Sequence, residues 1–247
     1  MKSTPRFVLN APPDPYGIAI VKGAEFHHMH AVMRLREGAP VELIDPGGRE
    51  YEGIIAGYER DRAIVRVGAA APIQESDRII LAAAIVKGPR MDFLVEKAAE
   101  LGTAELWPIQ CARGVVKGWG EARLARWRRL ALAAAKQCHA SRPMKVREPL
   151  EFSQLVSAVD PDTIPVICTI GAEPLAGVIR RTPHRAILIA CGPEGDFDDT
   201  ERATAIGAAF IPAGLGVNRL RSETAAIAAV SIASGTIAAI GAPAEVR

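Results

Sequence analysis

The most informative part of the sequence lies between residues 187 and 225, where two glycine-containing segments each lead toward a predicted helix. The first reads Gly192-Pro193-Glu194-Gly195-Asp196-Phe197 and directly follows an apolar run, Ala186–Cys191. The second reads Leu215-Gly216-Val217-Asn218-Arg219-Leu220-Arg221-Ser222-Glu223-Thr224-Ala225. Glycine lets a backbone approach a flat ligand closely. Ligands bind at the carboxyl ends of strands in open α/β sheets, so these loops predict two walls of one pocket.

The chain beyond residue 78 alternates apolar strands with helices. Ile79–Val86 is continuously apolar, which is typical of a strand that is covered on both faces. Asp198 and Glu201 form a capping-box pattern at the start of a helix that Gly207 ends. Further strands are predicted at Glu105–Ile109, Pro165–Ile170, Ala186–Cys191 and Phe210-Ile211, and further helices at Met91–Leu101, Glu121–Cys138 and Ser222–Ile240. This alternation predicts an α/β domain with a mostly parallel sheet.

The first 70 residues have a different pattern, with short strands joined by turns. One short helix is predicted near Phe26–Leu35, and Pro46-Gly47-Gly48 is a hairpin signal. The predicted strands are Arg6–Leu9, Ile18–Val21, Val41–Asp45, Glu50–Ile55 and Ala63–Val67. We therefore expect a small β-barrel domain over residues 1–70, of a kind that often carries RNA contacts, a linker over 71–78 and the α/β domain over 79–247.

Positive charge is concentrated in one segment. Between Arg113 and Arg147 there are ten Lys or Arg residues and one acid, Glu121, so this segment carries +9 and the rest of the chain −7 of the net +2. A solvated helix face is one interpretation. We prefer a polyanion partner, because acids that would neutralise the face are missing nearby.

Several kinds of chemistry are excluded. The chain has no G-x-S-x-G nucleophile elbow and no G-x-x-x-x-G-K-[ST] phosphate loop. Arg219 stands where a dinucleotide fingerprint starting at Gly214 would need its third glycine. His27, His28 and His30 lack zinc spacing, and we expect surface histidines and no metal. Four widely spaced cysteines, the lack of a signal-peptide core and apolar runs too short for a bilayer favour a cytoplasmic protein without a membrane partner.

The two glycine loops resemble the cofactor loops of the SPOUT class of RNA methyltransferases. Within this class, the combination is similar to the family that methylates N3 of a uridine in 16S ribosomal RNA. The resemblance extends to His27–Gly38, to Lys87-Gly88-Pro89-Arg90-Met91-Asp92 and to Glu96–Gly102. The chain departs from the family pattern at Asp196, where a second glycine is usual, at Asn218 and Arg219, where an Arg-Ile pair is usual, and at Ala140, where arginine is usual.

The resemblance implies a fold and a set of sites. The fold would be a SPOUT trefoil-knotted methyltransferase domain behind a PUA-like β-barrel domain, and the enzyme would be a homodimer acting on 16S rRNA or the small ribosomal subunit. S-adenosyl-L-methionine would be bound by Thr169, Ile170, Gly192, Pro193, Glu194, Gly195, Leu215, Gly216, Leu220, Ser222, Thr224 and Ala225. RNA would be bound by Arg6, Arg34, Arg36, Lys87, Arg90, Arg123, Arg126, Arg129 and Arg142.

Arg221 and Glu194 are the catalytic candidates. Arg221 would stabilise the uracil anion that forms when N3 loses its proton, or would instead form a salt bridge with Glu223 or Glu194. Glu194 would act as a base or, as we prefer, fix its loop. Two alternatives stay open: a SPOUT enzyme that acts on ribose 2′-O or on transfer RNA, and a non-catalytic RNA-binding factor in ribosome assembly.

Overall fold

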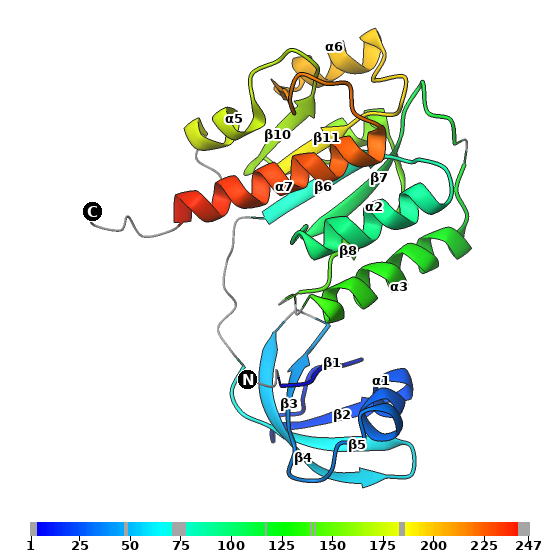
Figure 1. The fold of residues 1–247 in the computed structure, drawn as a ribbon, viewed down its shortest axis with the longest axis vertical. Coiled ribbons are helices and arrows are strands. Elements are labelled where there is room, and N and C mark those ends of the chain that lie inside the picture. The colour runs from blue at the N-terminus through cyan, green and yellow to red at the C-terminus, as the bar shows by residue number, and fades with distance from the viewer. Residues whose placement is uncertain are drawn as a thin grey trace. The chain divides into compact units, whose positions relative to one another are not determined.

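The computed structural model describes residues 4–46, 49–70, 78–116, 118–138, 140, 142–182 and 186–241. The chain divides into two compact units, Met1–Glu75 with Lys136–Pro143, and Ser76–Ala135 with Met144–Arg247. The predicted linker lies outside the described residues except for Arg78, and so do Gly47 and Gly48 of the predicted hairpin turn. Each unit is described separately below (Figure 1).

The first unit is built on a five-stranded sheet in the order β1-β3-β4-β5-β2. Its strands are β1 (Arg6–Val8), β2 (Ile18–Lys22), β3 (Pro40–Ile44), β4 (Glu50–Glu59) and β5 (Arg62–Val67). Inward side chains such as Phe7, Leu43 and Val65 are fully buried, because alternate residues of each strand face the same side. β4 continues past the predicted end at Ile55, where a bulge shifts the pairing before Gly57.

The helical segment of this unit starts earlier than the sequence predicts. α1 (Gly23–His27) begins directly after β2, and a π-helical turn, η1 (His28–Val32), continues it. The predicted helix end at Leu35 is wrong, because Arg34 has a positive φ of 52°, which α-helical backbone does not accommodate. Met29 is the buried residue that attaches this segment to the core.

The second unit contains a seven-stranded sheet whose pairs are all parallel, as the sequence predicts. Its strand order is β12-β10-β11-β6-β7-β8, with β9 also paired to β7. The strands are β6 (Arg78–Ala84), β7 (Glu105–Gln110), β8 (Lys145–Val146), β9 (Leu150–Glu151), β10 (Thr163–Cys168), β11 (Ala186–Cys191) and β12 (Ile211–Ala213). The central strands β6 and β11 are almost wholly buried, which explains their unbroken apolar sequences.

Helices cover both faces of this sheet. One face packs against α2 (Pro89–Glu100), α3 (Glu121–Gln137), α5 (Leu175–Arg181) and α7 (Ser222–Gly241), and the other against α4 (Phe152–Ser157) and α6 (Asp199–Gly207). Figure 1 shows α7 crossing one face of the sheet with α2 beside it. The predicted capping box is confirmed: Asp198 accepts from Glu201 N, and Glu201 accepts from Asp198 N. The short elements β8, β9, α4 and α5 were not predicted from the sequence.

The helix α7 is apolar around much of its circumference. By length and composition alone, Ser222–Ile240 would suffice to cross a membrane. In the structure Ala226, Ala229 and Val230 are completely buried, and the helix contacts α2, α5 and β6. Packing against the core therefore accounts for the buried face of the helix, whereas Ile240 near its end is 52% exposed.

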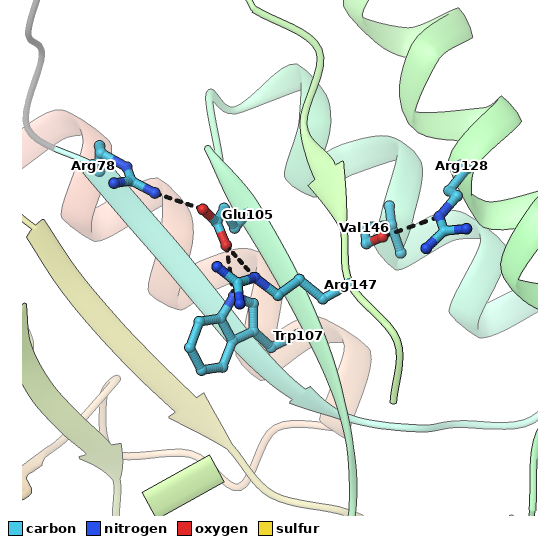
Figure 2. Close-up of polar contacts among 6 residues, drawn as sticks. All are labelled: Arg78, Glu105, Trp107, Arg128, Val146 and Arg147. Atoms are coloured by element: carbon cyan, nitrogen blue, oxygen red, sulfur yellow. Dashed lines mark hydrogen bonds and ion pairs between the residues drawn. The ribbon is translucent and has the colours of Figure 1, made fainter. Parts of the chain in front are cut away.

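A buried carboxylate joins three segments at the amino ends of the strands, at the edge of the sheet opposite the glycine loops. The Glu105 carboxylate of β7 accepts three hydrogen bonds (Figure 2). They come from Arg78 of β6 at 2.5 Å, from Arg147 at 2.6 Å and from the indole N–H of Trp107 at 2.9 Å. The Arg147 guanidinium also stacks on the Trp107 ring, 4.6 Å from its centroid. Arg128 of α3 donates to the Val146 carbonyl nearby, so the start of the sheet is cross-linked by polar contacts.

The ionisation of Glu105 gives the first prediction. Burial alone would raise the pKa of Glu105, but the bonds from Arg147 and Trp107 and the charge of Arg78 together lower it below the ordinary 4.5. A lowered pKa adds stability above pH 4.5 that is lost as the pH falls. Glu105→Gln should therefore lower the free energy of unfolding by about 2 kcal/mol at pH 7 and by less at pH 4, measured by urea denaturation. The exposed Glu148→Gln is the control, and equal losses at both pH values in Glu105→Gln would contradict this account.

Candidate active site

A pocket opens at the carboxyl ends of β10 and β11. The segments that follow β10, β11 and β12 form its walls. Its lining comprises Cys168, Thr169, Ile170, Cys191, Gly192, Pro193, Glu194, Asp196, Leu215, Gly216, Asn218, Arg219, Leu220, Ser222 and Ala225. All predicted cofactor residues except Gly195 and Thr224 are in this set. The two glycine loops therefore lie side by side, although residues 198–214 separate them in the chain.

The first loop, 192–197, is held by close packing. A Cβ on Gly192 would meet the ring of Phe197 at 3.2 Å, and a Cβ on Gly195 would meet Arg113 at 3.2 Å. Arg113 also donates to the Gly195 carbonyl at 3.1 Å. The segment after β7 is fixed in turn, because Ala112 N donates to Glu201 at 2.8 Å. The loop thus has little room to move away from the pocket.

Asp196 occupies a backbone conformation that glycine would adopt more easily. Its φ is 63°, in the left-handed region, which asparagine and aspartate tolerate better than most residues. Its carboxylate accepts from Phe197 N at 2.8 Å and from Arg202 at 2.7 Å. These bonds offset the backbone strain, so the departure from a second glycine preserves the shape of the loop.

The second loop approaches the chain after β10 very closely. Gly214 N donates to the Glu173 carbonyl at 2.7 Å, and Leu175 N donates to the Gly214 carbonyl at 2.9 Å. A Cβ on Gly214 would lie only 2.6 Å from the Ala172 carbonyl oxygen, so this contact requires glycine. Farther along, Ser222 is 5% exposed, and its hydroxyl has no hydrogen-bond partner among the described residues. A buried, unpaired hydroxyl beside a pocket is a group that a ligand can satisfy.

Arg90 connects both loops from the start of α2. Its guanidinium lies 2.5 Å from Glu194 and 3.7 Å from the buried Glu223. A salt bridge from Arg221 to Glu223 or Glu194 was one of two expectations from the sequence, and the structure places Arg90 beside both carboxylates instead. Within the described part of the chain no ion pair involves Arg221, which is exposed beside the pocket lining.

Five lining residues were not predicted as cofactor residues: Cys168, Cys191, Asp196, Asn218 and Arg219. The two cysteines end the strands that precede Thr169 and Gly192, so their position at the strand ends was the available signal. Asn218 and Arg219 had been noted only as departures from the family pattern. Among these residues Arg219 is notable because it brings a positive charge into the lining, two residues before Arg221.

The predicted RNA-binding residues differ in the exposure of their side chains and in whether they form ion pairs. Arg6 is 12% exposed and lies between Glu42 at 2.8 Å and Glu50 at 3.6 Å. Arg126 is exposed but pairs with Asp92 at 2.9 Å, and Arg90 is engaged as described. The others are exposed and have no ion pair within the described ranges: Arg34, Arg36, Lys87, Arg123, Arg129 and Arg142.

The predicted surface histidines take part in aromatic contacts. His30 is stacked on Phe26 at 5.4 Å between ring centroids and meets the edge of Tyr58 at 4.8 Å. His28 lies near Phe7, with their centroids 6.1 Å apart. In the described segments no group of three or more His, Cys, Asp or Glu side chains is arranged to hold a metal ion.

The left-handed backbone at Asp196 leads to the second prediction. Asp196→Gly should bind the ligand of this pocket within about threefold of the parent, because glycine adopts this φ without strain. Asp196→Val should bind it about tenfold more weakly, because a β-branched residue in this region costs on the order of 1–3 kcal/mol. Isothermal titration with S-adenosylmethionine measures both, and equal affinity of the two variants would contradict the assigned backbone role.

Comparison with known proteins gives consistent matches over most of the chain. The model of an RNA methyltransferase domain matches residues 74–234, and that of an RNA methyltransferase PUA domain matches residues 21–68. A protein of Mesomycoplasma hyopneumoniae named ribosomal RNA small subunit methyltransferase E is 33% identical over 62% of this chain and 68% of its own length. A protein of Bacillus subtilis with the same name is 26% identical over 87% of this chain and 88% of its own length.

Solved structures agree with this result. The ribosomal RNA small subunit methyltransferase E of Neisseria gonorrhoeae, bound to S-adenosylmethionine, superposes with a TM-score of 0.80 at 27% identity, covering 93% of this chain and 96% of the other. A putative methyltransferase of Legionella pneumophila, also in complex with this cofactor, gives a TM-score of 0.76 at 26% identity over 94% of this chain and 98% of the other.

Proposed function

Because the chain belongs to the RNA methyltransferase family of ribosomal RNA small subunit methyltransferase E, we propose that it transfers a methyl group from S-adenosylmethionine to N3 of a uridine in 16S ribosomal RNA. Dependence on this cofactor is a property of the family. What we propose is the substrate: a uridine as the nucleotide, N3 as the methylated atom and 16S ribosomal RNA as the molecule that contains it. We place this activity in the cytoplasm and expect a homodimer, and both stay predictions.

The observation that carries the proposal is the pocket formed by the two glycine loops. Most of its lining residues are small or apolar, which suits a flat, weakly polar adenine ring. The buried Ser222 hydroxyl lacks a partner and can bond a polar group of the cofactor. The lining also contains the carboxylates of Glu194 and Asp196, which are paired with Arg90 and Arg202. The residues present therefore fit S-adenosylmethionine.

When bound, S-adenosylmethionine supplies an electrophilic methyl group for an SN2 transfer. The protein must activate the uracil for attack, because its N3 carries a proton and has no free lone pair. Loss of that proton leaves negative charge on O2 and O4, which charge-assisted hydrogen bonds from a guanidinium stabilise. Arg221 is our candidate, since it is exposed beside the pocket and unpaired among the residues that the structure describes.

We assign Glu194 a role in fixing its loop. Its carboxylate bonds Arg90 at 2.5 Å, and Arg90 also faces Glu223 at the first turn of α7. This arrangement links the first glycine loop to the helix that follows the second one. Because the Glu194 carboxylate is bonded to Arg90, we favour alignment of the methyl donor and acceptor over base catalysis by Glu194.

RNA contacts are proposed for the exposed, unpaired cations. In the first unit these are Arg34, Arg36 and Arg142. In the second unit they are Lys87, Arg123 and Arg129, in the segments around α2 and α3. We do not propose Arg6 and Arg90 as RNA contacts, because their guanidinium groups form ion pairs with Glu42 and Glu194. N3 lies on the pairing edge of uracil, so the target base must be unpaired or extruded.

The role of Arg221 gives the third prediction. Arg221→Ala should lower kcat by about a hundredfold, the loss typical of one donor to a developing anion, and change the dissociation constant of S-adenosylmethionine by less than about twofold. Arg219→Ala on the same loop is the matched comparison. Single-turnover kinetics and calorimetry separate the two effects. Unchanged turnover in Arg221→Ala would exclude the role, and a selective loss in Arg219→Ala would assign it to Arg219.

The proposed reaction is tested by its product. Unmodified small ribosomal subunits and naked 16S rRNA are each incubated with the protein and labelled S-adenosylmethionine, and the nucleosides are then analysed by mass spectrometry. We expect N3-methyluridine. A 2′-O-methyl nucleotide, or label in transfer RNA alone, would favour another reaction of the same class. No transfer and no cofactor binding would favour a non-catalytic RNA-binding factor.

A further inference from the structure

Cys168 and Cys191 lie next to each other at the ends of two neighbouring strands. β10 and β11 are parallel, and their ladder pairs Ile167 with Ala190, so the next residue of each strand is one of the cysteines. The two sulfur atoms are 3.5 Å apart, and the Cys191 thiol donates to Cys168. The hydrogen bond with Cys168 and burial both raise the pKa of the Cys191 thiol. Neither cysteine forms a disulfide in the structure.

This pair belongs to the wall of the candidate cofactor pocket. Both cysteines line it, Cys191 being buried and Cys168 partly exposed. Cys168 precedes Thr169 and Ile170, and Cys191 precedes Gly192. Any change in the distance between the two sulfur atoms therefore acts directly on both strand ends that carry the pocket. No role in the proposed methyl transfer uses these thiols.

The backbone geometry permits a disulfide. Neighbouring strands lie about 4.8 Å apart, inside the range of Cα separations of about 4.4–6.8 Å that disulfides span. A disulfide bond of about 2.05 Å requires the sulfur atoms to approach by about 1.5 Å, which side-chain rotation and a small strand shift supply. The other two cysteines, Cys111 and Cys138, form no disulfide and are not part of the pocket lining.

We propose that Cys168 and Cys191 are an oxidisable dithiol that a low-molecular-weight disulfide converts into an intramolecular disulfide, and that this bond and bound S-adenosylmethionine exclude each other. The coupling rests on the proposed cofactor site. The pocket-facing Cys168 is accessible only when the pocket is empty, and the cross-link changes the wall against which the cofactor lies. Through this site, the ratio of small thiols to small disulfides would control whether the enzyme binds S-adenosylmethionine.

The reaction proceeds by two thiol–disulfide exchanges. Cys168 loses its proton to solvent, and its sulfur attacks one sulfur of the small disulfide, breaking that bond and releasing one thiolate. Cys191 then loses its proton, and its sulfur attacks the Cys168 sulfur of the mixed disulfide and releases the second thiolate. Two protein thiols are oxidised by two electrons, and the small disulfide is reduced to two thiols.

The test uses the full-length protein and glutathione disulfide. Fully reduced protein is incubated with the oxidant with and without saturating S-adenosylmethionine, and peptide mass spectrometry identifies the disulfides. Cofactor affinity is measured by calorimetry before oxidation, after it, and after reduction with dithiothreitol. We expect a Cys168–Cys191 disulfide that forms more slowly with cofactor present, and an affinity about tenfold or more lower after oxidation, restored by reduction.

Two variants complete the test, each judged by the ratio of its affinities before and after oxidation. In Cys168→Ser this ratio should stay near one, whereas Cys138→Ala, outside the pocket, should retain the loss seen in the parent. If reduced protein binds no cofactor, the proposed function is contradicted. If reduced protein binds it but forms no Cys168–Cys191 disulfide, or binds it equally well after forming one, this inference alone is overturned.

Discussion

The close approach of Gly214 to the chain after β10 is the constraint on which the pocket depends. Gly214 exchanges backbone hydrogen bonds with Glu173 and Leu175, and no side chain fits between Gly214 and the Ala172 carbonyl. This contact fixes where the chain leaves β12 and therefore where Leu215 to Ser222 can lie. Because β12 pairs with β10 and β10 with β11, the same contact places the second glycine loop against the first.

Side-chain interactions then hold the loops at these positions. Arg90 joins Glu194 of the first loop to Glu223 of α7, and Arg113 holds the Gly195 carbonyl from the segment after β7. Asp196 keeps its left-handed conformation through bonds to Phe197 N and Arg202. The pocket is thus preorganised by groups from four separate parts of the α/β unit. Such rigidity suits an enzyme whose rate depends mainly on the alignment of methyl donor and acceptor.

Local patterns in the sequence predicted most of the fold. The fold class is confirmed: a PUA-like β domain precedes a parallel α/β domain of SPOUT type, whereas threading of the chain through a knot stays a prediction. Continuous apolar runs located β6 and β11, because strands buried on both faces have no polar alternation. The short strands β8 and β9 were missed, since two residues cannot show a period. The helix near Phe26 was misplaced, because its π-helical turn does not follow the α-helical period.

Site residues within the glycine loops were predicted from sequence, but their long-range partners were not. Arg90 lies 104 positions before Glu194, and nothing in the local pattern distinguishes an arginine that clamps a loop from one that contacts RNA. The pairing of Cys168 with Cys191 depends on strand register, which the sequence alone did not fix. Arg6 likewise could be recognised as a structural residue only once Glu42 and Glu50 were placed beside it.

If the contact at Gly214 positions the second glycine loop for S-adenosylmethionine binding, Gly214→Ala should weaken that binding, which calorimetric titration measures. Gly207→Ala is the matched control, because a Cβ at Gly207 meets nothing within 4 Å. With folded protein verified by circular dichroism, binding should be at least about tenfold weaker in Gly214→Ala and equal to that of the parent in Gly207→Ala. Parental affinity in a folded Gly214→Ala variant would contradict this role of Gly214.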